Sequence, residues 1–180
     1  MSQDVLAAEP VLAPSSPLLP LEMVVHVFDT ISGLPLHPLA VHAVVVLLPV
    51  MCLVTIAVAV RASLRRFARV VLVLDVLVFL ATFVAKESGE QLLARVTQFS
   101  TASHDLRLHV QWADRLVVLA LGMVVVAAIL VFTQNRPGLA RYAAVIALLG
   151  GLVTIGTTVW VGDTGARAVW SQTIANTKAP

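Results

Sequence analysis

Four long apolar segments restrict what this chain can fold into. A helix that spans a membrane needs about 20 predominantly apolar residues, within a range of about 17–25. The second segment reaches about 20 residues if its helix continues into the "KESGEQLLARV" that follows it, and the third if its helix begins within the "SHDLRLHVQWADR" that precedes it. The segments run from Pro38 to Val60, Val70 to Ala85, Leu116 to Thr133 and Tyr142 to Val161. They predict four transmembrane helices, over about residues 38–60, 70–95, 103–133 and 142–161.

The composition agrees with lipid as the surrounding solvent. Hydrophobic residues make up 59% of the chain and charged residues 12%, whereas soluble domains are about 45–50% apolar and about 25% charged. A soluble core of this size could not hide so many aliphatic side chains. The net charge of +2 and the lack of a basic patch interleaved with aromatics argue against a nucleic-acid partner. The predicted fold class is therefore all-α, an integral membrane protein built as an antiparallel four-helix bundle.

The segments that flank the predicted bundle have a different character. Residues 1–20 include four prolines and a serine pair, a composition typical of an extended or disordered arm. Residues 21–33 carry apolar side chains at helical spacing and predict a short helix lying on the membrane surface. The transmembrane domain is then expected to cover residues 34–172, and residues 173–180 form a tail.

Arginines predict how the bundle is oriented. The loop "RASLRRFAR" and the loop "QNRPGLAR" carry only basic charges, while every acid except Asp75 falls on the opposite side of the predicted bundle. Loops rich in Lys and Arg face the cytoplasm in most membrane proteins. Both termini are therefore expected outside. We expect Asp75 to form a structural ion pair with Arg61, Arg65 or Arg141 rather than to relay protons.

Polar groups from all four predicted helices reach one level near the outer surface. With a rise of 1.5 Å per residue, His42, Glu87, His109 and Asp163 lie within about 10 Å of a common depth. Two histidines on facing helices can ligate one haem. This favours a b-type haem site with His42 and His109 as ligands, the His42 ring facing the bundle. His37 or His104, which stand at or above this level, could replace either ligand.

Two other functions fit the same residues. Imidazole and carboxylate groups also suit a transition metal, and the candidate ligands for such an outer-face site are His37, His42, Glu87, His104 and His109. The hypothesis ranked first is an accessory subunit of a larger, redox-related membrane complex. Its support is the small size, the proline-rich arm and a stripe of small residues on the fourth segment. No sequence pattern typical of a catalytic site occurs, so enzymatic activity is not expected.

The beginning and end of the apolar region resemble a known family. The stretch "LPLHPLAVH" and the terminal "GDTGARAVW" resemble, over residues 33–172, a bacterial membrane-protein family catalogued only as a domain of unknown function. The family's opening usually continues with Phe-Pro, where this chain has Ala43 and Val44, and its tail usually ends on a histidine, where this chain has Ser171 and Gln172. The resemblance implies a four-helix protein of the bacterial cytoplasmic membrane and no settled activity.

Overall fold

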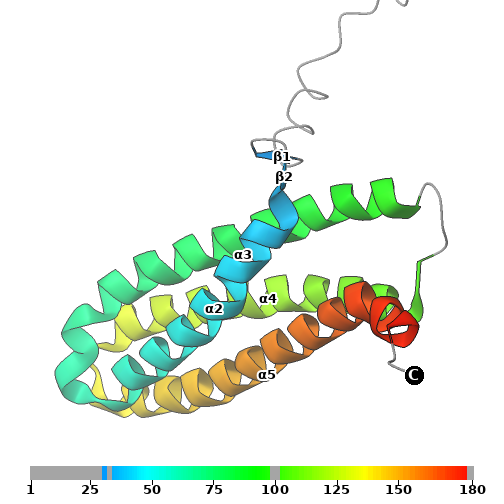
Figure 1. Cartoon of the computed structure of the whole chain (residues 1–180). Coiled ribbons are helices and arrows are strands. Elements are labelled where there is room, and N and C mark those ends of the chain that lie inside the picture. The colour runs from blue at the N-terminus through cyan, green and yellow to red at the C-terminus, as the bar shows by residue number, and fades with distance from the viewer. Residues whose placement is uncertain (1–29, 32–33, 98–101, 178–180) are drawn as a thin grey trace, which may run out of the picture.

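Four long helices form the structure, a computed structural model that describes residues 30–31, 34–97 and 102–177. Two antiparallel strands, β1 (Thr30–Ile31) and β2 (Leu34–Pro35), precede the helices. The short 3-10 helix η1 (Ala62–Phe67) connects the first long helix to the second. The predicted arm and surface helix lie outside the described residues, apart from 30–31. The helices, shown in Figure 1, are α2 (Leu36–Val60), α3 (Ala68–Thr97), α4 (His104–Thr133) and α5 (Pro137–Asn176).

Local sequence signals explain where the helices begin. Ser103 caps α4, because its hydroxyl accepts a hydrogen bond of 3.2 Å from the amide of Leu106. Pro137 stands at the first position of α5, where a missing amide hydrogen costs nothing. Helix α2 begins at Leu36, two residues before the predicted start. Proline is tolerated in a first turn, so Pro38 does not set the boundary, and His37 becomes part of the helix.

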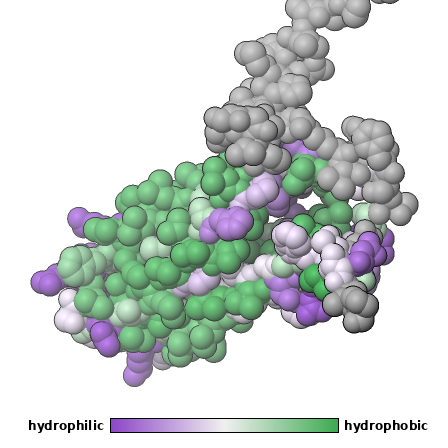
Figure 2. All heavy atoms as spheres, viewed as in Figure 1, coloured by the Kyte–Doolittle hydropathy of each residue, from purple (hydrophilic) through white to green (hydrophobic). Residues whose placement is uncertain are grey.

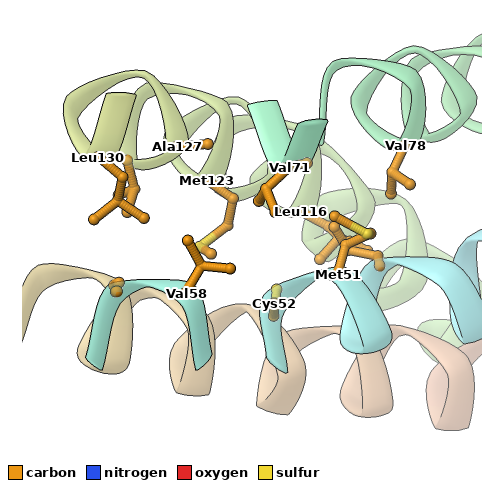
Figure 3. Packing of buried hydrophobic residues seen from close by; sticks show 14 of the residues in the cluster. Met51, Cys52, Val58, Val71, Val78, Leu116, Met123, Ala127 and Leu130 are labelled. Carbon is orange, nitrogen blue, oxygen red and sulfur yellow. The ribbon is translucent and has the colours of Figure 1, made fainter. Parts of the chain in front are cut away.

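The four helices pack as a square. Helices α2 and α4 each pack against both α3 and α5, while α2 and α4 lie diagonally opposite each other. Apolar side chains from all four helices fill the centre. Figure 3 shows Met123 of α4 pointing toward Val58 of α2, and Met51 of α2 and Leu116 of α4 belong to the same buried cluster. The diagonal helices therefore meet through long side chains at the middle of the core.

The outside of the bundle is apolar along most of its length. Leucine, valine and phenylalanine side chains are exposed on all four helices, and Phe132 is 80% exposed. Figure 2 shows a continuous hydrophobic surface between hydrophilic residues that gather toward the two ends. All four helices are long and apolar enough to cross a membrane. Soluble monomeric proteins rarely expose a continuous apolar surface of this extent. The fold is an all-α four-helix bundle with lipid as its surroundings, as the sequence predicted.

The two ends of the bundle differ in charge. We call one the arginine end, where the α2–α3 and α4–α5 connections carry Arg61, Arg65, Arg66, Arg69, Arg136 and Arg141. The opposite end is the histidine end, where α2 and α4 begin with His37 and His104 and where α3 carries Lys86, Glu87 and Glu90. All candidate ligands predicted from the sequence lie on the helix turns near the histidine end.

The chain consists of two similar helical hairpins, α2–α3 and α4–α5. Leu36–His37 at the start of α2 has its counterpart in Leu108–His109, inside α4. Counted from these histidines, buried residues of α2 coincide with buried residues of α4: Val44 with Leu116, Leu48 with Ala120, Met51 with Met123, Thr55 with Ala127 and Val58 with Leu130. Exchanging the two hairpins leaves the pattern of neighbouring helices unchanged. The bundle is therefore an approximate twofold repeat.

Helices α3 and α5 repeat each other in the same way. The sequence Glu87-Ser88-Gly89 of α3 has its counterpart in Asp163-Thr164-Gly165 of α5. In the same alignment, buried Thr82, Ala85 and Ser88 coincide with buried Thr158, Val161 and Thr164. These matched positions cluster at the histidine end, and they decide how the histidines are held.

Candidate functional site

His37 is held against α3 by one hydrogen bond and one glycine. Its Nδ1 donates to the carbonyl oxygen of Ala85 at 2.8 Å, and the ring lies over Gly89. A Cβ atom at position 89 would stand only 2.8 Å from Cε1 of His37. Ser88 completes this contact, since its hydroxyl donates to the same carbonyl at 2.9 Å. The glycine is thus required for the close approach of the ring to the helix.

His109 is held against α5 in the same manner. Its Nδ1 donates to the carbonyl oxygen of Val161 at 2.9 Å. A Cβ atom at position 165, now glycine, would lie 2.9 Å from Cε1 of His109, and the Thr164 hydroxyl donates to the Val161 carbonyl at 3.1 Å. Each half of the repeat therefore contributes one histidine with the same carbonyl acceptor, hydroxyl neighbour and glycine platform.

The two histidine rings meet between the diagonal helices. Their ring centres lie 6.3 Å apart, and the ring planes are inclined by 80°. A carbonyl oxygen only accepts hydrogen bonds, so Nδ1 of each ring must carry a hydrogen, and in the neutral ring Nε2 then keeps its lone pair. Fixing Nδ1 in this way is how proteins orient a histidine that binds a metal through Nε2. The arrangement presents two potential ligand atoms at one end of the bundle.

Charged and aromatic side chains surround the histidine pair. Lys86 lies 2.6 Å from Glu90, 3.3 Å from Glu87 and 3.9 Å from Asp114, so one cation links acids of α3 and α4. Trp112 of α4 contacts Trp160 of α5 edge-on with ring centres 6.5 Å apart. Tryptophan favours the depth where lipid headgroups meet hydrocarbon. The histidine pair therefore lies close to this boundary, with charged side chains at about the same level.

The other candidate ligands point elsewhere. His42 is exposed, and its Nδ1 donates to the Pro38 carbonyl of its own helix. His42 follows His37 by five positions, or about 140° around the helix. Its ring therefore points away from the bundle, whereas the sequence analysis expected it to face inward. His104 is exposed at the start of α4, and Glu87 pairs with Lys86. The structure brings His37 together with His109, and the described residues include no group of three metal-ligating side chains.

Asp75 also differs from its expected setting. The carboxyl group is buried in α3 and accepts a hydrogen bond of 2.8 Å from the Thr55 hydroxyl of α2. No arginine in the described part of the chain forms an ion pair with it. The predicted ion pair with Arg61, Arg65 or Arg141 is therefore replaced by a hydroxyl partner.

The sequence analysis missed the residues that orient the histidines. Gly89, Gly165, Ser88 and Thr164 carry no metal-binding group, so a search for ligands passes over them. The signal that finds them is the internal repeat, because an acid, a hydroxyl residue and a glycine recur at matching places in both hairpins. A small residue repeated at one face of two helices indicates close approach of another side chain.

Comparisons with known proteins identify a family and no activity. No curated protein matches the chain, and no solved structure matches it. Residues 33–178 match the model of a family described as "Predicted membrane protein (DUF2231)". This match covers all four helices and agrees with the resemblance seen at the two ends of the apolar region. The chain belongs to the DUF2231 family of membrane proteins.

Proposed function

We propose that this protein is a membrane-embedded b-type haem protein in which His37 and His109 would hold the iron. The observation that carries the proposal is the separation of the two rings. Imidazoles on opposite sides of one metal have ring centres about 6.4 Å apart, since the bond is about 2.1 Å and the nitrogen lies about 1.1 Å from the ring centre. The ring centres of His37 and His109 are 6.3 Å apart.

The donor set favours haem over a bare metal ion. A bare transition metal needs three or four protein ligands, and the described residues offer no group of that size. The porphyrin supplies four nitrogens itself, so two imidazoles complete the coordination of its iron. The outer-face metal site built from His37, His42, Glu87, His104 and His109 therefore has less support than the two-histidine haem site.

The surroundings of the two rings suit a redox centre. A bound haem supplies one-electron transfer between ferric and ferrous iron. Ala85 and Val161 hold each Nδ1 hydrogen, which fixes the rings and raises the basicity of Nε2. Both rings are partly buried, and the degree of burial is one of the factors that set a haem potential.

An electron carrier of this kind needs a donor and an acceptor. The proposal therefore includes the role of an accessory subunit in a larger redox complex of the bacterial cytoplasmic membrane, with the histidine end and both termini outside. Support for this orientation is the set of arginines at the opposite end. The role follows from the chemistry of electron transfer, and it is tested separately from haem binding.

The test is a visible spectrum of the full chain, produced with ample haem and purified in detergent. We expect the wild type to show the reduced-minus-oxidised bands of six-coordinate haem b, and His37→Ala and His109→Ala to lose them. His42→Ala and His104→Ala are matched controls, because both histidines lie at the same end but outside the pair. Imidazole added to His37→Gly should restore the bands, which separates a lost ligand from misfolding.

Two results would contradict the proposal. One is a wild-type protein that is folded and colourless after haem supplementation. The other is loss of the bands in His42→Ala with retention in His37→Ala. Elemental analysis of the same samples decides the alternative, since one zinc or copper per chain without haem would favour a metal site at the histidine pair.

A further inference from the structure

One carboxyl group lies deep in the core, away from the histidine pair. Asp75 of α3 is 4% exposed and Thr55 of α2 is 0% exposed. Asp75 is the one charged residue among the buried residues of the described chain. Ionisable groups inside a membrane protein are costly and usually functional, so its presence asks for an explanation beyond packing.

The groups around Asp75 leave its charge uncompensated. The Thr55 hydroxyl donates to Oδ2 at 2.8 Å. Cys52 of α2 is the titratable side chain that faces the carboxyl group, and Thr154 of α5 lies beside that cysteine. Across the described parts of α4 and α5, no charged side chain interacts with Asp75. A neutral, protonated carboxyl group suits this site, and an ionised one does so only with compensation from elsewhere.

The internal repeat shows that packing does not require the pair. The positions that correspond to Thr55 and Asp75 in the second hairpin are Ala127 and Gly151, and both are buried. Two small residues without polar side chains thus stand at the equivalent positions, and the side chain of Ile56 from α2 fills the space beside Gly151. Replacing a buried polar pair by apolar residues is often neutral or stabilising. The hydroxyl–carboxyl pair is therefore an addition to one half of the bundle.

The chemistry of the site favours a proton as its ligand. A metal cation such as sodium or calcium would need about six oxygen ligands, and the carboxyl group with Thr55 supplies far fewer. The buried hydroxyls of Thr82 and Thr158 lie between Asp75 and the histidine pair, and those of Ser88 and Thr164 lie at the level of the pair itself. Each donates to a backbone carbonyl of its own helix, so each oxygen is free to accept a further hydrogen bond.

We infer that Asp75 is a proton-binding site that takes up a proton when the centre between His37 and His109 gains an electron. This inference rests on the proposed haem function. Asp75 precedes Ala85, the partner of His37, by ten positions on α3, so the two sites lie about 15–20 Å apart. One added negative charge at that distance, with an effective dielectric constant near 20, changes the proton affinity by about fivefold. By thermodynamic linkage, protonation of Asp75 raises the affinity of the centre for the electron by the same factor.

The test compares haem reduction in wild type and Asp75→Asn over a range of pH. In wild type, the midpoint potential should fall as pH rises through the titration of Asp75, and this part of the dependence should vanish in Asp75→Asn with an unchanged spectrum. Lys86, Glu87, Glu90 and Asp163 contribute equally to both proteins. A merely structural carboxyl group would leave the two pH profiles parallel, and that result would overturn the inference.

A second measurement distinguishes this failure from failure of the haem proposal. Infrared difference spectra between acidic and alkaline pH report the carbonyl stretch of a protonated carboxylic acid without needing haem. The wild type should show a band that Asp75→Asn lacks and that Thr55→Val shifts. A colourless protein with this band refutes the haem site and retains the proton site. Absence of the band refutes proton binding, whatever the haem content, and a band that sodium removes at constant pH indicates a cation site instead.

Discussion

Replacing Gly165 by alanine should destabilise the bundle, whereas the same change at Gly162 should not. A Cβ atom at position 165 would lie 2.9 Å from both Cε1 and Nδ1 of His109, but one at position 162 would meet no atom within 4 Å. The ring cannot move away from position 165 without breaking a hydrogen bond, because its Nδ1 donates to the carbonyl of Val161, which lies on α5 like Gly165. Overpacking costs about 1–3 kcal/mol and a lost hydrogen bond about 1 kcal/mol.

The comparison removes the general effect of alanine. Alanine is favoured over glycine in a helix by about 1 kcal/mol, and both variants gain this, so Gly165→Ala should be less stable than Gly162→Ala by about 2–4 kcal/mol. The measurement is reversible unfolding of the detergent-solubilised protein in SDS, followed by circular dichroism. By the internal repeat, Gly89→Ala should behave like Gly165→Ala. Equal stability of the Gly162 and Gly165 variants would refute the assigned packing of the histidine rings.

Three further outcomes follow from the structure. Thr55→Ala alone should cost about 1–3 kcal/mol, since it leaves a buried acceptor unpaired, while adding Asp75→Leu should recover most of that loss in the same unfolding assay, because an apolar residue of similar volume often replaces a buried polar group without cost; a further loss would show that packing requires the pair. Lys86→Ala should cost about 1 kcal/mol or less, because its pair with Glu90 is partly exposed, and high salt should erase the difference. A cysteine at Ser63 should react with a membrane-impermeant thiol reagent only after cells are opened; labelling of intact cells would reverse the topology.

The helices were predictable because lipid imposes a simple condition on the sequence. Backbone groups in hydrocarbon must be satisfied within a helix, so length and hydropathy alone indicate α2, α3, α4 and α5. The ends were less predictable. Helix α5 runs on to Asn176, well beyond the expected end near residue 161, because the polar residues that follow Val161 mark the edge of the hydrocarbon and not the end of the helix.

The histidine pair was only partly predictable. Residue counts give depth along a helix, and they placed His37, His42 and His109 near one level. They do not give the rotation of a helix about its axis, which is decided by the residues of neighbouring helices. Gly89 and Gly165 are the residues that admit the rings, and their role depends on contacts between segments far apart in the sequence. The depth argument therefore led to the histidine end, and it favoured His42, whose side chain is exposed, over His37, whose ring lies against α3.

The two proposed sites relate differently to the internal repeat: the histidine pair uses matched residues of both hairpins, and the proton site uses residues of the first hairpin alone. An iron between two imidazoles needs two equivalent ligands, and the repeat supplies His37 and His109 with matching acceptors at 2.8 and 2.9 Å. A proton needs a single carboxyl group, and only the first hairpin carries one at the position that Gly151 fills in the second. A mutation pattern follows from this difference. Changes at matched positions of the two hairpins should have matched effects on the histidine pair. Introducing a carboxyl group at position 151 should not substitute for Asp75, because a Cβ atom there would lie 2.7 Å from Cδ1 of Ile56 and because Ala127 offers no hydroxyl to the carboxyl group.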